Sequence, residues 1–317
     1  MPKLHKCPAE LFELDLSGKV YVVTGGNSGI GKITVQQLYK QGATVVLACR
    51  RVQEGQKVKD DILMNDGAKG AIEVEELDLA SLKSVRGFAE KILKSHPAIH
   101  GLINNAGIMN TPFGKTVDGF EQQIGVNHLG HYLLTELLLP ALKAAAPSRI
   151  VCVASCFHDK AFGKEGVIDF EDMFFEKRKY DGWTAYAQSK LANVLHARQL
   201  AKRLEGTGVI AVSIHPGWVR TNLFKHSMPL FIQNYVLRPI LKMMGMIEPW
   251  QGTQSSLYAV LSPDVAKHPG AFFSQVGMYR SKKANKGGWP MTSPNPHALD
   301  DQAAERLDKV SRQLVGL

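Results

Sequence analysis

Residues 19–31 of this chain read Lys19-Val20-Tyr21-Val22-Val23-Thr24-Gly25-Gly26-Asn27-Ser28-Gly29-Ile30-Gly31. The apolar first half predicts a buried strand, and the glycines that follow allow a tight turn. Residues 32–40 then predict a helix, with Gly42 where a helix C-terminal glycine belongs. A helix that begins directly after such a turn presents backbone N–H groups to a pyrophosphate. We therefore predict a dinucleotide-binding turn that comprises Gly25, Asn27, Ser28, Gly29, Ile30 and Gly31.

Strands and helices alternate along the rest of the chain. Later apolar runs predict strands over residues 44–49, 71–77, 101–103, 149–154, 209–214 and 272–273. Helical spacing predicts helices over residues 53–64, 119–143, 186–204, 252–261 and 303–314. Ser81 is a candidate N-cap for a further helix, and Pro140 interrupts the helix over residues 119–143 near its end. Alternation of this kind indicates βαβ units. We predict an α/β, single-domain Rossmann fold over residues 1–317, with a doubly wound, mostly parallel seven-stranded sheet and helices on both faces.

Composition narrows the class of protein. The 317 residues are 44% hydrophobic, enough for a large core, and the formal net charge is +9. A basic balance suits a phosphate-rich ligand, but basic residues are not interleaved with aromatics, so we do not expect a nucleic-acid partner. The four cysteines form no Cys-x-x-Cys pair, and we expect buried thiols and no metal site. We predict neither a signal peptide nor a transmembrane segment, and a cytoplasmic or peripherally membrane-associated protein.

Four polar residues suggest a reaction centre. Tyr186 and Lys190 are four residues apart, so they share one face of a helix. Ser155 ends a predicted strand, at the carboxyl edge where open α/β sheets bind ligands. Asn127 lies within a predicted helix, where asparagine has poor propensity and needs another reason.

Together these motifs resemble those of the short-chain dehydrogenases/reductases. The matching motifs, in that family's order, are Thr24-Gly25-x-x-x-Gly29-x-Gly31, Asn104-Asn105-Ala106-Gly107, Asn127, Ser155, Tyr186-x-x-x-Lys190 and Pro216-Gly217. Residues 125–131, 189–193 and 215–217 are similar to those of the retinol dehydrogenases, whose relatives include the WW-domain oxidoreductase and protochlorophyllide oxidoreductase. The family commonly has two serines where this chain has Ala154 and Ser155, and residues 157–185 form an insertion as in the retinol dehydrogenase branch.

The resemblance implies roles for these residues. Tyr186 would be the general acid/base, Lys190 would favour its phenolate and hold ribose hydroxyls, and Ser155 would bind the substrate oxygen. Asn127 would orient a water that links Lys190 to solvent. The remaining residues implied to contact the cofactor are Asp78, Leu79, Asn105, Ala106, Gly107, Pro216, Gly217, Val219 and Thr221.

The end of the second predicted strand bears on the choice of cofactor. An acid there would bind the 2′-hydroxyl of NAD, but this chain has Arg50 and Arg51 and no acid until Glu54. Arginine side chains match phosphate geometry. We therefore expect NADP(H).

Residues 222–249 are rich in Met, Leu, Ile and Phe with scattered basic residues. They stand where the family builds its substrate lid, and the resemblance implies a hydrophobic carbonyl or alcohol, such as a retinoid, a steroid or a lipid aldehyde. The same stretch would also suit packing against a homodimer partner or peripheral membrane contact. Two other functions stay open: reduction of a carbon–carbon double bond, as in protochlorophyllide oxidoreductase, and a non-catalytic NADP-binding regulator.

Overall fold

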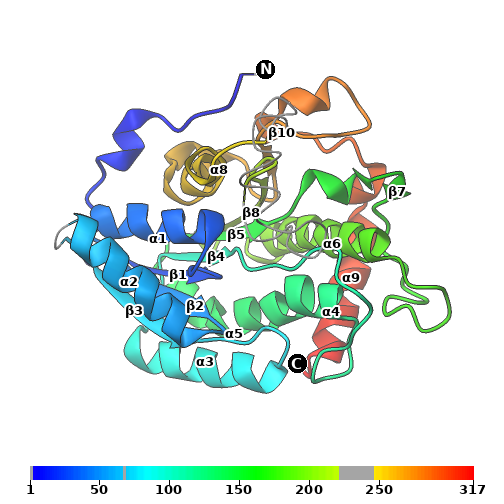
Figure 1. The fold of residues 1–317 in the computed structure, drawn as a ribbon, viewed down its shortest axis with the longest axis horizontal. Coiled ribbons are helices and arrows are strands. Elements are labelled where there is room, and N and C mark those ends of the chain that lie inside the picture. The colour runs from blue at the N-terminus through cyan, green and yellow to red at the C-terminus, as the bar shows by residue number, and fades with distance from the viewer. Residues whose placement is uncertain (1–2, 67–68, 221–245) are drawn as a thin grey trace, which may run out of the picture.

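The computed structural model describes residues 3–66, 69–220 and 246–317. Its centre is an eight-stranded sheet in the order β10-β9-β8-β5-β4-β1-β2-β3, with helices on both faces (Figure 1). The strands are β1 (Val20–Thr24), β2 (Thr44–Cys49), β3 (Ala71–Glu76), β4 (Gly101–Asn104), β5 (Ser148–Val153), β8 (Val209–His215), β9 (Phe272–Ser274) and β10 (Gly288–Met291). The helices of eight residues or more are α1 (Gly29–Lys40), α2 (Val52–Asp66), α3 (Leu82–Ser95), α5 (Gly130–Ala144), α6 (Gly182–Arg203), α8 (Pro249–Leu261) and α9 (Asp301–Leu314).

The order of the strands locates the part of the sheet where a ligand would bind. The chain adds β2 and β3 on one side of β1 and then returns to add β4, β5 and β8 on the other side, with all these pairs parallel. The topological switch point therefore lies between β1 and β4. Ligands of open α/β sheets bind in the crevice beyond the carboxyl ends of the strands at this point.

The predicted fold class is confirmed, but the sheet has one strand more than the seven expected. The additional strand, β10, pairs antiparallel with β9 at the edge of the sheet. Its sequence is Gly288-Trp289-Pro290-Met291. Glycine and proline are depleted in strands, and proline is tolerated at an edge because one side of an edge strand pairs with nothing. The local sequence therefore did not predict this strand.

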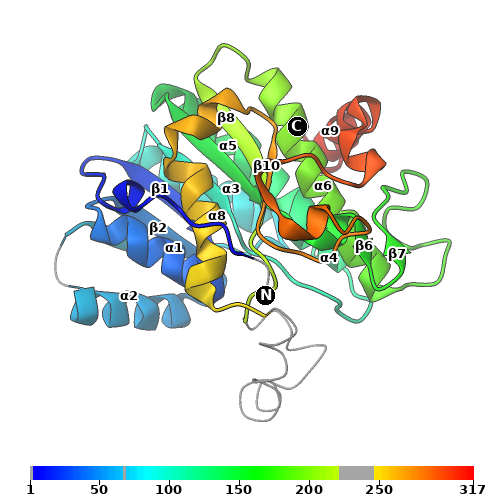
Figure 2. The same cartoon turned by 90° about the horizontal axis from the view of Figure 1, so that it is seen from above.

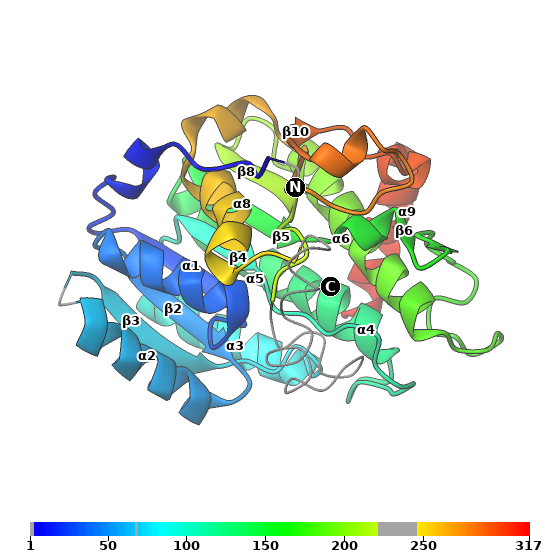
Figure 3. The same cartoon turned by 45° about the horizontal axis from the view of Figure 1, so that its top comes forward.

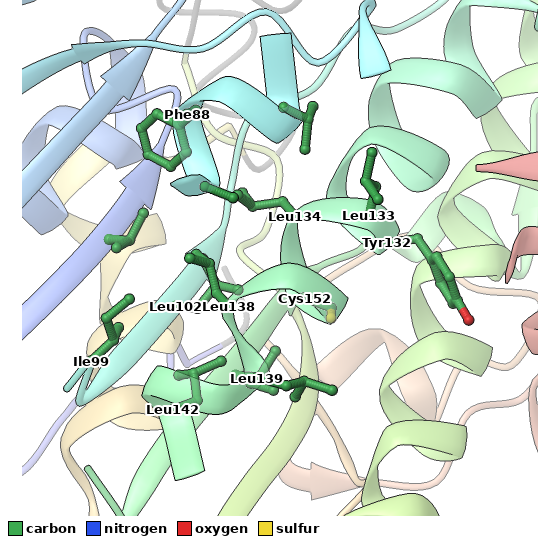
Figure 4. Close-up of a cluster of buried hydrophobic side chains, with 14 of the residues drawn as sticks. Phe88, Ile99, Leu102, Tyr132, Leu133, Leu134, Leu138, Leu139, Leu142 and Cys152 are labelled. Atoms are coloured by element: carbon green, nitrogen blue, oxygen red, sulfur yellow. The ribbon is translucent and has the colours of Figure 1, made fainter. Parts of the chain in front are cut away.

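Side chains alternate between two cores, one on each face of the sheet. Val22, Val46 and Leu102 pack toward α3, α5 and α6, and Figure 4 shows Leu102 of this core beside Leu138. Val23 and Val45 point the other way, into the core under α1 and α8. Because the sheet is covered by an apolar core on each face, its strands are continuous hydrophobic runs in the sequence.

The helix expected over residues 119–143 differs from the prediction. It begins as a short α4 (Gln122–Ile124), passes through a π-helical turn (Gly125–Leu129) and continues as α5. Pro140 lies inside α5 and does not end it. The π-helical turn contains Asn127, and such turns occur frequently at functional sites.

Residues 157–185 contain little regular structure. A 3₁₀ turn (Cys156–His158) is followed by a two-stranded hairpin, β6 (Lys160–Ala161) and β7 (Lys164–Glu165). The chain then runs irregularly to α6, which Asp181 caps by accepting the Thr184 backbone N–H at 2.8 Å. Helix α6 consequently begins before the predicted residue 186, at Gly182.

The N-terminal strap, residues 3–16, contacts α8 and the residue that follows β9. The His5 backbone N–H donates to Gln275 Oε1 at 3.0 Å, and Gln275 Nε2 donates to the His5 carbonyl at 2.6 Å. The Cys7 backbone N–H donates to Gln254 Oε1 on α8 at 3.0 Å. Figure 2 shows this segment in dark blue beside α8.

Two further sequence expectations concern cysteines and membranes. The four cysteines are buried free thiols, as expected. No helix in the described part of the chain combines the length and the apolar character needed to span a bilayer. The expected lid, residues 222–249, lies almost entirely outside the described residues.

Candidate active site

The glycine turn joins β1 to α1 in a shape that excludes side chains. Gly25 and Gly29 have left-handed backbones, with φ of 66° and 54°. A Cβ atom on Gly31 would lie 2.4 Å from the Gly25 carbonyl oxygen, so only glycine fits there. Ser28 is the N-cap of α1 but forms no side-chain cap hydrogen bond. The N-terminus of α1 thus offers backbone N–H groups to an anion, which fits a dinucleotide pyrophosphate.

A polar clamp holds this turn against the end of β4. Thr24 Oγ1 accepts the backbone N–H groups of Asn105 and Ala106, each at 2.9 Å. Asn105 Nδ2 donates to the Thr24 carbonyl at 2.7 Å. The predicted cofactor residues Asn105, Ala106 and Gly107 therefore lie beside the glycine turn, at the switch point of the sheet.

The end of β2 carries the predicted arginines together with a carboxylate that the sequence analysis left without a role. Arg50 and Arg51 are both exposed. Arg51 Nη2 is 2.9 Å from Glu54 Oε2, and Asn27 Nδ2 donates to the same oxygen at 3.1 Å. Glu54 thus connects the glycine turn to the end of β2.

The remaining predicted cofactor residues lie at the same edge of the sheet, as far as they are described. Asp78 Oδ1 accepts the Ala80 backbone N–H at 3.0 Å, in the turn after β3, and Leu79 is buried. Gly217 follows β8 with φ of 93°. Val219 pairs with Ile247. Pro216 lies between β8 and Gly217, and Thr221 lies outside the described residues.

Ser155, Tyr186 and Lys190 come from two adjacent elements. Ser155 follows β5 and is buried, and its Oγ accepts the Phe157 backbone N–H at 3.2 Å. Tyr186 and Lys190 are buried on α6, with Lys190 Nζ 5.7 Å from the centre of the Tyr186 ring. Lys190 Nζ also donates to the Val153 carbonyl at 2.9 Å. The structure therefore places a hydroxyl, a phenol and an amine together at the carboxyl end of β5.

Burial dominates the electrostatics of this cluster. It raises the pKa of the Tyr186 phenol, and the neighbouring Ser155 hydroxyl offsets part of that rise. Burial also lowers the pKa of Lys190 to about 8. Both shifts favour the uncharged forms, as expected for groups removed from water. The phenol therefore needs an additional positive charge before it can release a proton near neutral pH.

Asn127 lies next to Lys190 but is held by other groups. Its Oδ1 accepts the Ile108 backbone N–H at 2.9 Å, while its Nδ2 donates to the Ile108 carbonyl and to Ser189 Oγ, each at 2.9 Å. A Cβ on Gly107 would lie 3.2 Å from Asn127 Oδ1 and 3.4 Å from Lys190 Nζ. The asparagine thus fixes the loop after β4 against α6, around the lysine.

His131 is a site residue that the sequence analysis missed. Its Nδ1 lies 3.0 Å from the Asn127 carbonyl and its Nε2 lies 2.8 Å from Thr24 Oγ1. Burial lowers the pKa of His131 to about 4, so the ring is neutral, with Nδ1 donating to the carbonyl and Nε2 accepting from the hydroxyl. Its spacing of four residues from Asn127 on one helix was the available signal.

A second missed group supports Ser155 from the C-terminal third of the chain. His158 Nδ1 is 2.6 Å from the Ser155 carbonyl, and its Nε2 is 2.6 Å from Ser293 Oγ. Asn295 Nδ2 donates to the carbonyls of His158 and Gly166 at 2.6 and 2.8 Å. Ser293 and Asn295 are more than a hundred residues away from His158 along the chain, so no local pattern could reveal these contacts.

Comparisons with known proteins agree with this geometry. The family model for short chain dehydrogenases matches residues 19–166. Human retinol dehydrogenase 12 is 43% identical over 96% of this chain and 88% of its own length, and human retinol dehydrogenase 13 is 40% identical over 98% and 88%. This chain belongs to the short-chain dehydrogenase/reductase family. Within it, the sequence lies in the retinol dehydrogenase branch.

Solved structures support the same fold. A crystal structure of an uncharacterized protein from Mycobacterium paratuberculosis has a TM-score of 0.73 and 33% identity, and the match covers 95% of each chain. At 23% and 20% identity, a Brucella melitensis reductase solved with NADH and a Shigella flexneri dehydrogenase solved with NADP share the fold, with TM-scores of 0.62 and 0.63. Membership in the short-chain dehydrogenase/reductase family makes the chain an oxidoreductase of a type that binds nicotinamide cofactors.

Proposed function

We propose that this protein is an NADP(H)-dependent oxidoreductase that interconverts a hydrophobic carbonyl compound and its alcohol. The observation that supports it most directly is the convergence of Ser155, Tyr186 and Lys190 beside the glycine turn, at the switch point of the sheet. Because the nicotinamide, when bound, supplies or accepts the hydride, the protein needs to hold the substrate oxygen and move one proton.

Tyr186 is assigned as the residue that donates the proton to the substrate oxygen and takes it back in the reverse reaction. In carbonyl reduction its hydroxyl donates to the substrate oxygen, which Ser155 Oγ holds by a hydrogen bond. Since burial raises the pKa of Tyr186, the charge of Lys190 is needed to stabilise the phenolate that remains. Asn127 keeps the loop after β4 in place beside Lys190, and a water between Asn127 and Lys190 remains a prediction.

Preference for NADP(H) is supported by Arg50 and Arg51 at the end of β2. A guanidinium group matches the 2′-phosphate in geometry and charge. The hydrophobic nature of the substrate is supported by the names of the relatives, which are retinol dehydrogenases, and by the apolar composition of residues 222–249. That stretch also keeps open the proposals of membrane contact and of a homodimer.

The test is carbonyl-dependent oxidation of NADPH, measured with a panel of hydrophobic aldehydes and ketones. Substituting Tyr186→Phe removes the proton donor, so we expect at least a hundredfold loss of kcat, because general acid catalysis contributes about 10²–10⁴-fold. NADPH binding, followed by fluorescence, is expected to persist. The matched control is Tyr258→Phe on α8, which removes a hydroxyl bonded to Asp264 and lies outside the site.

Full activity of Tyr186→Phe would overturn the assigned mechanism. If the unmodified protein binds NADPH tightly but reduces no carbonyl in the panel, the non-catalytic regulator becomes the better proposal.

A further inference from the structure

The tip of the hairpin β6–β7 presents an aromatic ring in an unfavourable backbone conformation. Phe162 has φ of 45° and is 66% exposed, and Gly163 beside it has φ of 88°. Two successive positive φ angles define the hairpin turn that favours asparagine and glycine. A phenylalanine at the first position costs backbone energy and exposes a large apolar side chain. Backbone strain of this kind persists most often at functional sites.

Phe162 belongs to a cluster of three rings. Its ring centre lies 4.5 Å from that of Trp183 and 5.4 Å from that of Phe157. The centres of Phe157 and Trp183 are 5.6 Å apart. Phe157 is buried, Trp183 is half-buried and Phe162 is exposed. The cluster is thus a continuous set of ring contacts that leads from a buried side chain to an exposed one.

The buried end of this cluster touches the residues assigned to the reaction. The ring centre of Phe157 lies 6.2 Å from that of Tyr186, edge to face, and the Phe157 backbone N–H donates to Ser155 Oγ. Trp183 is one turn before Tyr186 on α6. Helix α6 runs back from the carboxyl edge of the sheet, and Figure 3 shows its first turns near β6. Trp183 therefore lies closer than Tyr186 to the N-terminal end of α6, and it is the more exposed of the two.

We propose that Phe157, Phe162 and Trp183 form the subsite that holds the apolar body of the substrate. A carbonyl held by Ser155 and Tyr186 leaves the rest of the molecule to extend outward over these rings. The aromatic faces would bind an elongated or planar hydrocarbon group by burial and stacking. This assignment rests on the proposed function and gives the 157–185 insertion a role in selecting the substrate.

The test compares aldehydes that share a reacting group but differ in apolar length. The variant is Phe162→Asn, because asparagine tolerates a positive φ and removes the ring without straining the turn. We expect kcat/KM for decanal to fall about tenfold, which is the effect of losing one stacking and burial contact. We expect kcat/KM for butanal, whose chain is six carbons shorter, to stay unchanged, and Tm to stay equal or rise.

Two companion variants complete the experiment. Phe162→Tyr keeps the aromatic face and is expected to retain the preference for decanal. Met64→Asn removes an exposed apolar side chain from α2, which packs beside β3 at the edge of the sheet away from β10. This control is expected to leave kcat/KM unchanged for both aldehydes. Binding of decanol, measured by tryptophan fluorescence, is expected to weaken in Phe162→Asn, and this readout requires no turnover.

The outcomes separate the subsite from the proposed function. An equal fall for butanal and decanal, no fall for either, or unchanged kinetics with altered self-association would overturn the subsite. If the unmodified protein reduces no aldehyde, the proposed function fails, and decanol binding then decides the subsite alone: unchanged binding in Phe162→Asn overturns it.

Discussion

Glu54 shows how one residue can separate the roles of two neighbouring arginines. Its carboxylate is paired with Arg51 and bonded by Asn27, so the charge of Arg51 is already balanced. Among the described residues, Arg50 has no ion pair of this kind. Of the two, Arg50 is therefore the one with a guanidinium charge left to pair with a 2′-phosphate.

We predict that Arg50→Gln lowers kcat/KM for NADPH by about tenfold or more, since a hydrogen bond to a charged group contributes about 1.5–3 kcal/mol. NADH, which lacks the phosphate, is expected to change little, and Arg51→Gln is expected to have the smaller effect on NADPH. Steady-state kinetics with both cofactors measure this. An equal fall for NADPH and NADH after Arg50→Gln would contradict the assignment.

Among individual residues, the sequence revealed those whose partners are near in the chain or that belong to a known motif. Tyr186 and Lys190 were found from their spacing on one helix. His131, His158 and Asn295 were not found, because a buried polar side chain in a sequence does not reveal which distant group it bonds. Thr24, the partner of His131, is 107 residues away, and Ser293, the partner of His158, is 135 residues away.

At the scale of elements, the segment that begins with Ser155 is held by the C-terminal part of the chain. Asn295 bonds two carbonyls of this segment, and Arg280 forms an ion pair with the buried Asp159 and donates to Glu165 at 2.9 Å. The 3₁₀ turn and the hairpin therefore depend on residues from another part of the fold for their shape.

We predict that Asn295→Ala lowers the free energy of unfolding by about 1–3 kcal/mol, because it leaves buried carbonyls without donors. It is also expected to reduce kcat, since His158 positions the Ser155 backbone. Urea denaturation and steady-state kinetics measure the two effects. Asn65→Ala on the exposed end of α2 is the control, expected within about 0.5 kcal/mol of the unmodified protein. A similarly small change for Asn295→Ala would refute the prediction.

Regular elements were easier to predict than irregular ones. The strands β2 and β5 were placed correctly within a residue because their apolar runs are decisive. The hairpin β6–β7 and strand β10 escaped because they are short and carry charged residues or proline. The π-helical turn at Asn127 also escaped, since its hydrogen bonding cannot be distinguished by hydrophobic periodicity from an ordinary helix.

At the scale of the whole molecule, several histidines are buried in neutral form. Burial lowers the pKa of His131 and His158 to about 4 and that of His196 and His215 to about 3. In the unfolded chain these side chains titrate near pH 6.5. Between those values the unfolded state binds more protons than the folded state, so acid favours unfolding.

We predict that the free energy of unfolding is fully maintained above about pH 6.5 and falls as the pH drops toward 4. Each such histidine contributes up to about 1.4 kcal/mol per pH unit. Chemical denaturation at a series of pH values measures the slope. His196→Phe removes one of these groups, and its slope is expected to be shallower. A stability that does not change between pH 7.5 and 5 would disprove this account.

The N-terminal strap constrains when the molecule can be completed during synthesis. His5 and Cys7 leave the ribosome before their partners Gln275 and Gln254, which follow them by 270 and 247 residues. Until those residues emerge, the strap's hydrogen bonds to them cannot form. The strands β1 to β5 are therefore synthesised before the strap can reach its final place, which requires Gln254 and Gln275 to have emerged.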